Sequence, residues 1–201
     1  MQKRFCLLLT LGALIMSATS ASAFGLDELS AALTQSPMST GRFVQEKELS
    51  GFPKPMRTEG IYYLDVHKGI VWETRKPFMS TMVFSKQGLN IRTAQGEKSL
   101  SAKEIPYLKT INEIIVSVLS ARMDALKSDF EIRLAGDRRQ WTITLVTRPE
   151  SALKAAFNTM RIEGDRVART ITMQNAKNEK TVLYLSEQKA MAKWPKHLDS
   201  L

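Results

Sequence analysis

Short runs in which apolar and polar residues alternate, each followed by a turn, make up most of this sequence. Successive side chains of a strand point to opposite faces, so a period of two is typical of strands with one buried face. The links between the runs are short, and most contain Gly, Pro, Asn or Asp, which favours antiparallel hairpins. The pattern predicts ten strands, at residues 42–49, 59–65, 70–74, 80–84, 88–93, 130–134, 140–147, 159–163, 167–174 and 180–185.

Two segments follow a helical period instead. The first lies before Pro37 and has Leu26, Leu29 and Leu33 at helical spacing. The second, 107–123, interrupts the strands with apolar residues at i, i+3, i+4 and i+7. Many strands in sequential hairpins curl into a barrel or a strongly bent sheet, and the apolar faces of both helices must be buried on its concave side. We therefore expect a container with a helical lid.

The N-terminal segment has the order of a secretory signal peptide. A basic start at 1–4 precedes an apolar run at 5–16, and the small residues Ala21, Ser22 and Ala23 follow. The apolar run is shorter than the ~20 residues that span a bilayer. We expect cleavage after Ala23, export to the periplasm, and one domain over residues 24–201. The single cysteine is Cys6, so the mature chain would contain neither disulfides nor thiolate ligands.

Charge and residue usage favour a binding protein over an enzyme. The chain has 29 Lys and Arg against 20 Asp and Glu, and the basic residues are scattered. For an exported protein this excess suits an anionic lipid surface or an acidic partner rather than nucleic acid. The two histidines, His67 and His197, lack a patterned nucleophile or a carboxylate cluster. We expect no catalytic residue, no metal and no cofactor.

Motifs along the chain resemble the LolA-like periplasmic outer-membrane lipoprotein carriers. The family's usual pattern is F-x-Q, G-x-L-x-L, a W-E strand, a proline and an S-x-G turn. In the first half the matching segments are Phe43-x-Gln45, Gly60-Ile61-Tyr62-Tyr63-Leu64, Ile70-Val71-Trp72-Glu73, Pro77, Phe84-Ser85 and Gly88-Leu89. In the second half they are Trp141-Thr142-Ile143-Thr144-Leu145, Met160-Arg161-Ile162 and Thr170-Ile171-Thr172-Met173.

The resemblance implies a mainly β (α+β) fold, an incomplete antiparallel β-barrel of about ten to eleven strands with helices that cap a hydrophobic cavity for acyl chains. The carriers have an arginine before the W-E pair that ties the barrel to its lid, whereas this sequence has Val71 at that latch position. This difference indicates a divergent member of the family.

The function expected from the resemblance is a periplasmic carrier. It would bind acyl chains of a lipid or lipoprotein and move them between the inner and outer membranes. The expected partners are an inner-membrane export complex and an outer-membrane acceptor, and the carrier would act as a monomer. The alternative is a lipid-sensing regulatory or binding module that does not transport. The residues expected to line the cavity are Phe43, Tyr63, Trp72, Phe84, Leu108, Ile111, Ile115, Leu119, Trp141, Ile143, Met160 and Ile162.

The C-terminal segment 189–198 is a further candidate contact surface. It mixes lysines with the apolar residues Met191, Trp194 and Leu198. Such a stretch suits docking to a membrane surface or to an acidic partner, and the alternative is a frayed terminus with ordinary lysines.

Overall fold

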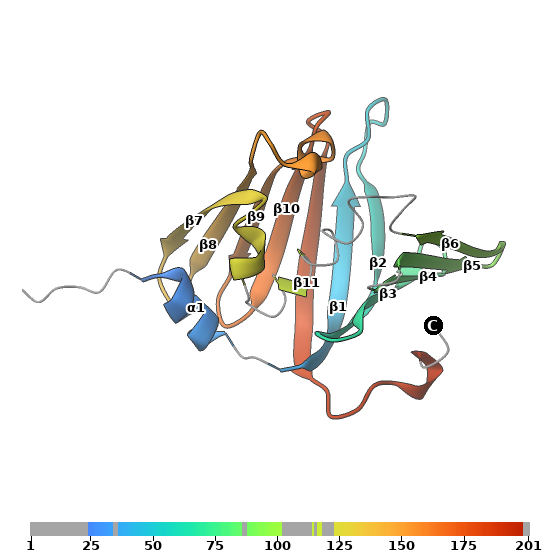
Figure 1. Ribbon diagram of the computed structural model, residues 1–201. Coiled ribbons are helices and arrows are strands. Elements are labelled where there is room, and N and C mark those ends of the chain that lie inside the picture. The colour runs from blue at the N-terminus through green and yellow to red at the C-terminus, as the bar shows by residue number, and fades with distance from the viewer. Residues whose placement is uncertain are drawn as a thin grey trace, which may run out of the picture.

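The computed structural model describes residues 24–33, 36–85, 88–101, 114, 116–117 and 123–198. In this part of the chain, one antiparallel sheet contains eleven strands (Figure 1). The strands are β1 Met38–Lys47, β2 Met56–Asp65, β3 Gly69–Lys76, β4 Ser80–Ser85, β5 Gly88–Thr93, β6 Gly96–Ser101, β7 Phe130–Gly136, β8 Trp141–Thr147, β9 Phe157–Gly164, β10 Ala168–Asn175 and β11 Lys180–Ala190. The described helices are α1 Leu26–Ala32 and three short 3₁₀ helices, η1 Asp124–Leu126, η2 Ala152–Ala155 and η3 Lys196–Leu198.

The sheet consists of two meanders joined at its centre. The strand order is β6-β5-β4-β3-β2-β1-β11-β10-β9-β8-β7, so every neighbouring pair is sequential except β1 and β11. These two strands pair antiparallel, with Phe43 opposite Leu185 and Lys47 opposite Thr181. The end strands β6 and β7 do not pair with each other. The sheet is therefore open, and the predicted incomplete antiparallel barrel is confirmed.

All ten predicted strands are present, with boundaries that differ by a few residues. The additional strand is β6, which hydrogen-bonds only to β5 and is exposed at nearly every position. It lacks the alternation of apolar residues that identified the others, because neither of its faces is well covered. Of the helix predicted at 107–123, the described residues 114 and 116–117 are helical. The rest of that helix before Met123 lies outside the described residues.

Helices cover the concave face over one end of the sheet. In Figure 1, α1 and η1 lie in front of β7 to β9. Leu29 of α1 and Leu126 of η1 belong to the core cluster that also contains Trp141, Ile143 and Ile162. Trp141 is only 1% exposed, and its indole N–H donates a hydrogen bond to the Asp165 carbonyl. Burying each large apolar side chain of this kind contributes about 1.5–3 kcal/mol, so this end is a packed core.

The C-terminal segment packs against the outer face of the sheet. Leu198 is 3% exposed and clusters with Val71 and Val83, and Trp194 packs against the same cluster. The imidazole Nε2 of His197 lies 3.0 Å from a carboxylate oxygen of Glu73. The apolar residues of this segment thus contact the protein's own β3 and β4, and a frayed terminus does not describe them.

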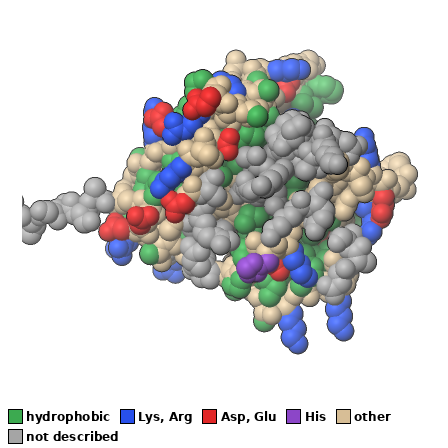
Figure 2. Space-filling model, viewed as in Figure 1, with side chains coloured by type: hydrophobic (Ala, Val, Ile, Leu, Met, Phe, Trp, Pro, Cys, Tyr) green, Lys and Arg blue, Asp and Glu red, His purple; other side chains and the backbone are tan. Residues whose placement is uncertain are grey.

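Charged side chains are spread over the surface. Figure 2 shows Lys and Arg distributed around the outline of one face, with Asp and Glu among them. Among the described residues, no helix is long and apolar enough to span a membrane.

Candidate functional site

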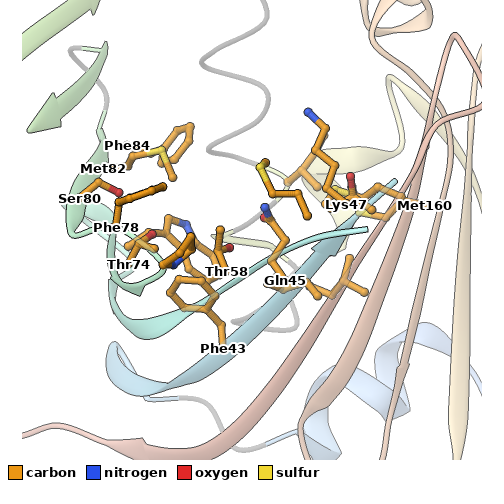
Figure 3. A pocket seen from close by; sticks show the side chains of 18 of the residues that line it. Phe43, Gln45, Lys47, Thr58, Thr74, Phe78, Ser80, Met82, Phe84 and Met160 are labelled. Atoms are coloured by element: carbon orange, nitrogen blue, oxygen red, sulfur yellow. The ribbon is translucent and has the colours of Figure 1, made fainter. Parts of the chain in front are cut away.

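A cavity of about 660 Å³ lies on the concave face, over the strands that flank the central β1–β11 pairing. Such a volume is typical of sites for small ligands. Its described lining comes from β1 to β4, β9 to β11, the β3–β4 connection and Ile114, and includes no residue of β7 or β8 (Figure 3). The apolar lining residues are Phe43, Met56, Trp72, Pro77, Phe78, Met82, Phe84, Ile114, Phe157, Met160, Ile171, Met173 and Leu183.

Aromatic packing fixes the base of the cavity. The rings of Phe43 and Trp72 meet edge to face with their centroids 4.7 Å apart, and Tyr62 lies 5.6 Å from Trp72 on the other side. Edge-to-face pairs are favourable because the positive ring edge meets the negative ring face. Trp72 is opposite Met82 on β4, so the thioether extends the same apolar surface. Phe43, Trp72 and Met82 thus form an apolar floor of the cavity, with Tyr62 packed against Trp72.

Four of the predicted lining residues do line the cavity: Phe43, Trp72, Phe84 and Met160. Three others, Trp141, Ile143 and Ile162, point to the concave face but lie in the packed core and are not part of the lining. Their position follows from the helices that cover this end of the sheet. Leu108, Ile111, Ile115 and Leu119 lie outside the described residues, although Ile114 from the same segment does line the cavity.

Tyr63 and Val71 require a correction, because both face away from the cavity. Tyr63 pairs with Val71 across β2 and β3, whereas Tyr62 pairs with Trp72. Since alternate residues of a strand point to opposite faces, the inward Trp72 forces Val71 outward. Val71 is 2% exposed and packs against Leu198. An arginine at position 71 would therefore meet the C-terminal segment and not the cavity.

Sequence reasoning missed the polar part of the lining. Six polar residues line the cavity: Gln45, Lys47, Thr58, Thr74, Ser80 and Thr181. Gln45 and Lys47 are two and four residues after Phe43, and the alternation of β1 therefore places them on the same face. This spacing is the signal in the sequence that indicates them.

The polar residues are arranged as cross-strand pairs. Thr58 is opposite Gln45, Lys47 is opposite Thr181, and Thr74 is opposite Ser80. All three pairs lie toward the end of the sheet that carries the β1–β2 and β3–β4 turns. Figure 3 shows Gln45 and Thr58 between Lys47 on one side and Thr74 and Ser80 on the other. We call these six residues the polar band.

The opening of the cavity lies beside the polar band. Phe78, in the β3–β4 turn, lines the cavity and is still 82% exposed. Met56, at the start of β2, also lines it and is exposed. Lining residues that reach solvent mark the rim, so the cavity runs from an apolar floor at Trp72 to a polar, open end. Among the described residues there is no cluster of His, Cys, Asp and Glu able to hold a metal ion.

The sequence matches the family model for outer membrane lipoprotein carrier protein LolA-like over residues 18–193. No curated protein sequence matches it.

Several solved structures have a similar arrangement. A LolA superfamily protein from Nitrosomonas europaea aligns with a TM-score of 0.48 and 10% identity, covering 88% of this chain and 97% of that one. A chain of the Pseudomonas aeruginosa MucA/MucB complex aligns with a TM-score of 0.48 and 13% identity, covering 86% of this chain and 58% of that one. The family match extends over most of the sequence, and this chain therefore belongs to the LolA-like family of outer membrane lipoprotein carrier proteins.

Proposed function

We propose that this protein is a periplasmic carrier that binds acyl chains of a lipid or lipoprotein and moves them between the inner and outer membranes. The observation that carries the proposal is the cavity of about 660 Å³ with its floor at Phe43 and Trp72. Family membership supports the same function. In this proposal, the signal peptide 1–23 is removed after Ala23 and residues 24–201 form a single lipid-binding domain.

The physical basis of binding is the removal of apolar surface from water. Each methylene group of a buried acyl chain contributes about 0.8 kcal/mol. Methionine side chains at positions 82, 160 and 173 line the cavity, and their flexible thioethers adapt to chains of variable shape. We propose no catalytic step and no cofactor. The protein would load at an inner-membrane export complex and unload at an outer-membrane acceptor, as a monomer.

One observation favours the alternative of a lipid-sensing module. Strand β3 contacts the C-terminal segment through Val71 on its outer face and lines the cavity through Trp72 on its inner face. A ligand that displaces Trp72 would thus shift β3, and this shift would change the contact of β3 with the C-terminal segment. In that case the filled protein would change its affinity for a partner without passing the lipid on.

An occluding substitution tests whether the cavity is the binding site. Thr74 is half-buried, lines the cavity, and has the small residues Gly60 and Ser80 as its cross-strand partners. Thr74→Trp therefore has room to place its ring in the cavity, and we expect uptake of a fluorescent fatty acid to fall at least tenfold. The matched control is Thr144→Trp on the outer face of β8, between Arg133 and Arg161.

Uptake that is equal in the wild type and Thr74→Trp, with both folded by circular dichroism, would exclude this cavity as the site. A second assay separates the carrier from the sensor. Donor vesicles containing a labelled lipid and unlabelled acceptor vesicles are separated by a membrane that only the protein can cross. Label in the acceptor vesicles supports a carrier, whereas lipid retained on the protein supports a sensor.

A further inference from the structure

We infer that the polar band is a subsite for an anionic head group, so that the cargo is a negatively charged amphiphile held with its head at Lys47 and its chain on Trp72. This inference rests on the proposed function. It adds the chemical class of the cargo and its direction in the cavity.

Lys47 places a positive charge in the lining. Its ammonium group forms no ion pair or hydrogen bond with any described residue, whereas nearby basic groups are neutralised. Arg57 lies 2.8 Å from the Glu46 carboxylate, and Lys76 lies 2.8 Å from the Glu59 carboxylate. Both of these acidic residues alternate with the inward residues of their strands and are not part of the lining. A bound anion would supply Lys47 with the carboxylate or phosphate partner that none of the described residues provides.

The rest of the polar band supplies neutral hydrogen-bond donors. No described residue is a hydrogen-bond partner for the Gln45 amide or for the side-chain hydroxyls of Thr58, Thr74 and Thr181. Side-chain amides and hydroxyls that face a cavity without partners favour a ligand with several acceptor oxygens. A carboxylate or phosphate has such oxygens, and hydrogen bonds to a charged acceptor are stronger than those between neutral groups.

The described lining contains no acidic residue. A ligand anion would thus meet one cation and several donors, and no repelling carboxylate among the described residues. At the opposite end, Phe43, Trp72 and Met82 offer an anion no partner, and an unpaired charge in apolar surroundings is costly. These two ends therefore impose one direction on an amphiphile, with its head near the exposed Phe78 and Met56 rim.

The test compares three ligands that share a twelve-carbon chain: laurate, dodecyl phosphate and dodecanol. Each displaces a neutral fluorescent probe from the mature protein at low ionic strength. For the wild type we expect both anions to bind roughly tenfold more tightly than dodecanol. Lys47→Gln should abolish this preference by weakening the binding of laurate and dodecyl phosphate. Lys47→Arg keeps the positive charge and should therefore retain the preference for the two anions. The control is Lys54→Gln, in the β1–β2 turn and outside the lining.

The outcomes separate the subsite from the cavity. Equal binding of all three ligands to the wild type overturns the head-group subsite and leaves the acyl cavity intact. An effect of Lys54→Gln as large as that of Lys47→Gln attributes the preference to overall charge and also overturns the subsite. Failure of all three ligands to bind overturns the proposed function together with the inference. A preference for dodecyl phosphate over laurate would assign a phosphate head, and the reverse a carboxylate head.

Discussion

We predict that the binding affinity depends on the length of the acyl chain, up to the length that fills the cavity. A methylene group occupies a volume close to that of a water molecule, about 30 Å³, so about 660 Å³ holds roughly 20 such groups. With the head group at the polar band, a chain of about 16 to 18 carbons fills the remaining volume of the cavity. Each added methylene up to that length should improve affinity by about 0.8 kcal/mol, or roughly fourfold.

The assay is a displacement series with saturated fatty acids from about eight to 22 carbons, each below its aggregation concentration. Between ten and 14 carbons, four added methylenes should tighten binding by about 3 kcal/mol, or roughly two hundredfold. Beyond about 18 carbons the affinity should stop rising, because further methylenes stay in water. Thr74→Trp, which fills part of the cavity, should move this plateau to shorter chains, and Thr144→Trp should leave it in place.

Two results would refute the reasoning. An affinity that hardly changes from eight to 14 carbons would show that the chain stays in water and that only the head is bound. An affinity that still rises beyond 20 carbons would show that the chain lies outside the described cavity. Salt separates the two contributions further, because screening weakens the exposed head-group contact and leaves the apolar gain per methylene unchanged.

Three further predictions concern stability. Trp141→Ala removes a fully buried side chain and its hydrogen bond to Asp165, and should lower the free energy of unfolding by about 3–5 kcal/mol, measured by urea titration; a loss below about 1 kcal/mol would contradict the packed core. Burial raises the pKa of the Tyr62 phenol above its ordinary value of 10.0. The contribution of this phenol to the free energy of unfolding is therefore fully present below about pH 10, and it is lost as the pH rises toward the higher pKa of the folded state. Between about pH 9 and pH 11, wild-type stability should therefore fall more steeply than that of Tyr62→Phe, and parallel curves would count against this burial. Leu198→Ala should weaken tail docking by about 2 kcal/mol or more and shift Trp194 fluorescence to the red with faster tryptic cleavage at Lys193; an unchanged spectrum and cleavage rate would mean that the tail is held by its polar contacts.

Strands with one covered face were the predictable part of the fold. In β8 every second residue from Trp141 to Thr147 is buried, and from Trp141 to Leu145 apolar and polar residues alternate in the same way. Strand β6 has little covered surface, so Leu100 is the single apolar side chain in its sequence Gly96–Ser101, and the strand could not be recognised from hydrophobic alternation. The alternation of apolar and polar residues reflects the burial of one face of a strand. It therefore identifies only those strands that have a buried face.

The sequence indicated several of the residues that lie on the concave face of the sheet. It did not indicate which strands of that face line the cavity. Tyr62 and Tyr63 are adjacent tyrosines, and only their pairing with Trp72 and Val71 reveals which one faces inward. Trp141 has the correct face but lies under the helices, since alternation within one strand contains no information about which helix covers it. The sequence therefore predicted a cavity and part of its floor. The spacing of Gln45 and Lys47 after Phe43 also indicates two members of the polar band, while their cross-strand partners required the three-dimensional arrangement.

The central β1–β11 pairing has a consequence for the order of folding. It joins residues at opposite ends of the sequence, as the register of Lys47 with Thr181 shows, and the cavity lies across it, with Phe43 and Leu183 on its two sides. Contacts of such large sequence separation form late, because the intervening chain must first be ordered. Each meander can pair its own strands independently, but neither contains the complete lining of the cavity. Under the proposed function, the capacity to take up lipid would thus arise only when β11 has paired with β1, so that a partly exported chain would not load cargo prematurely.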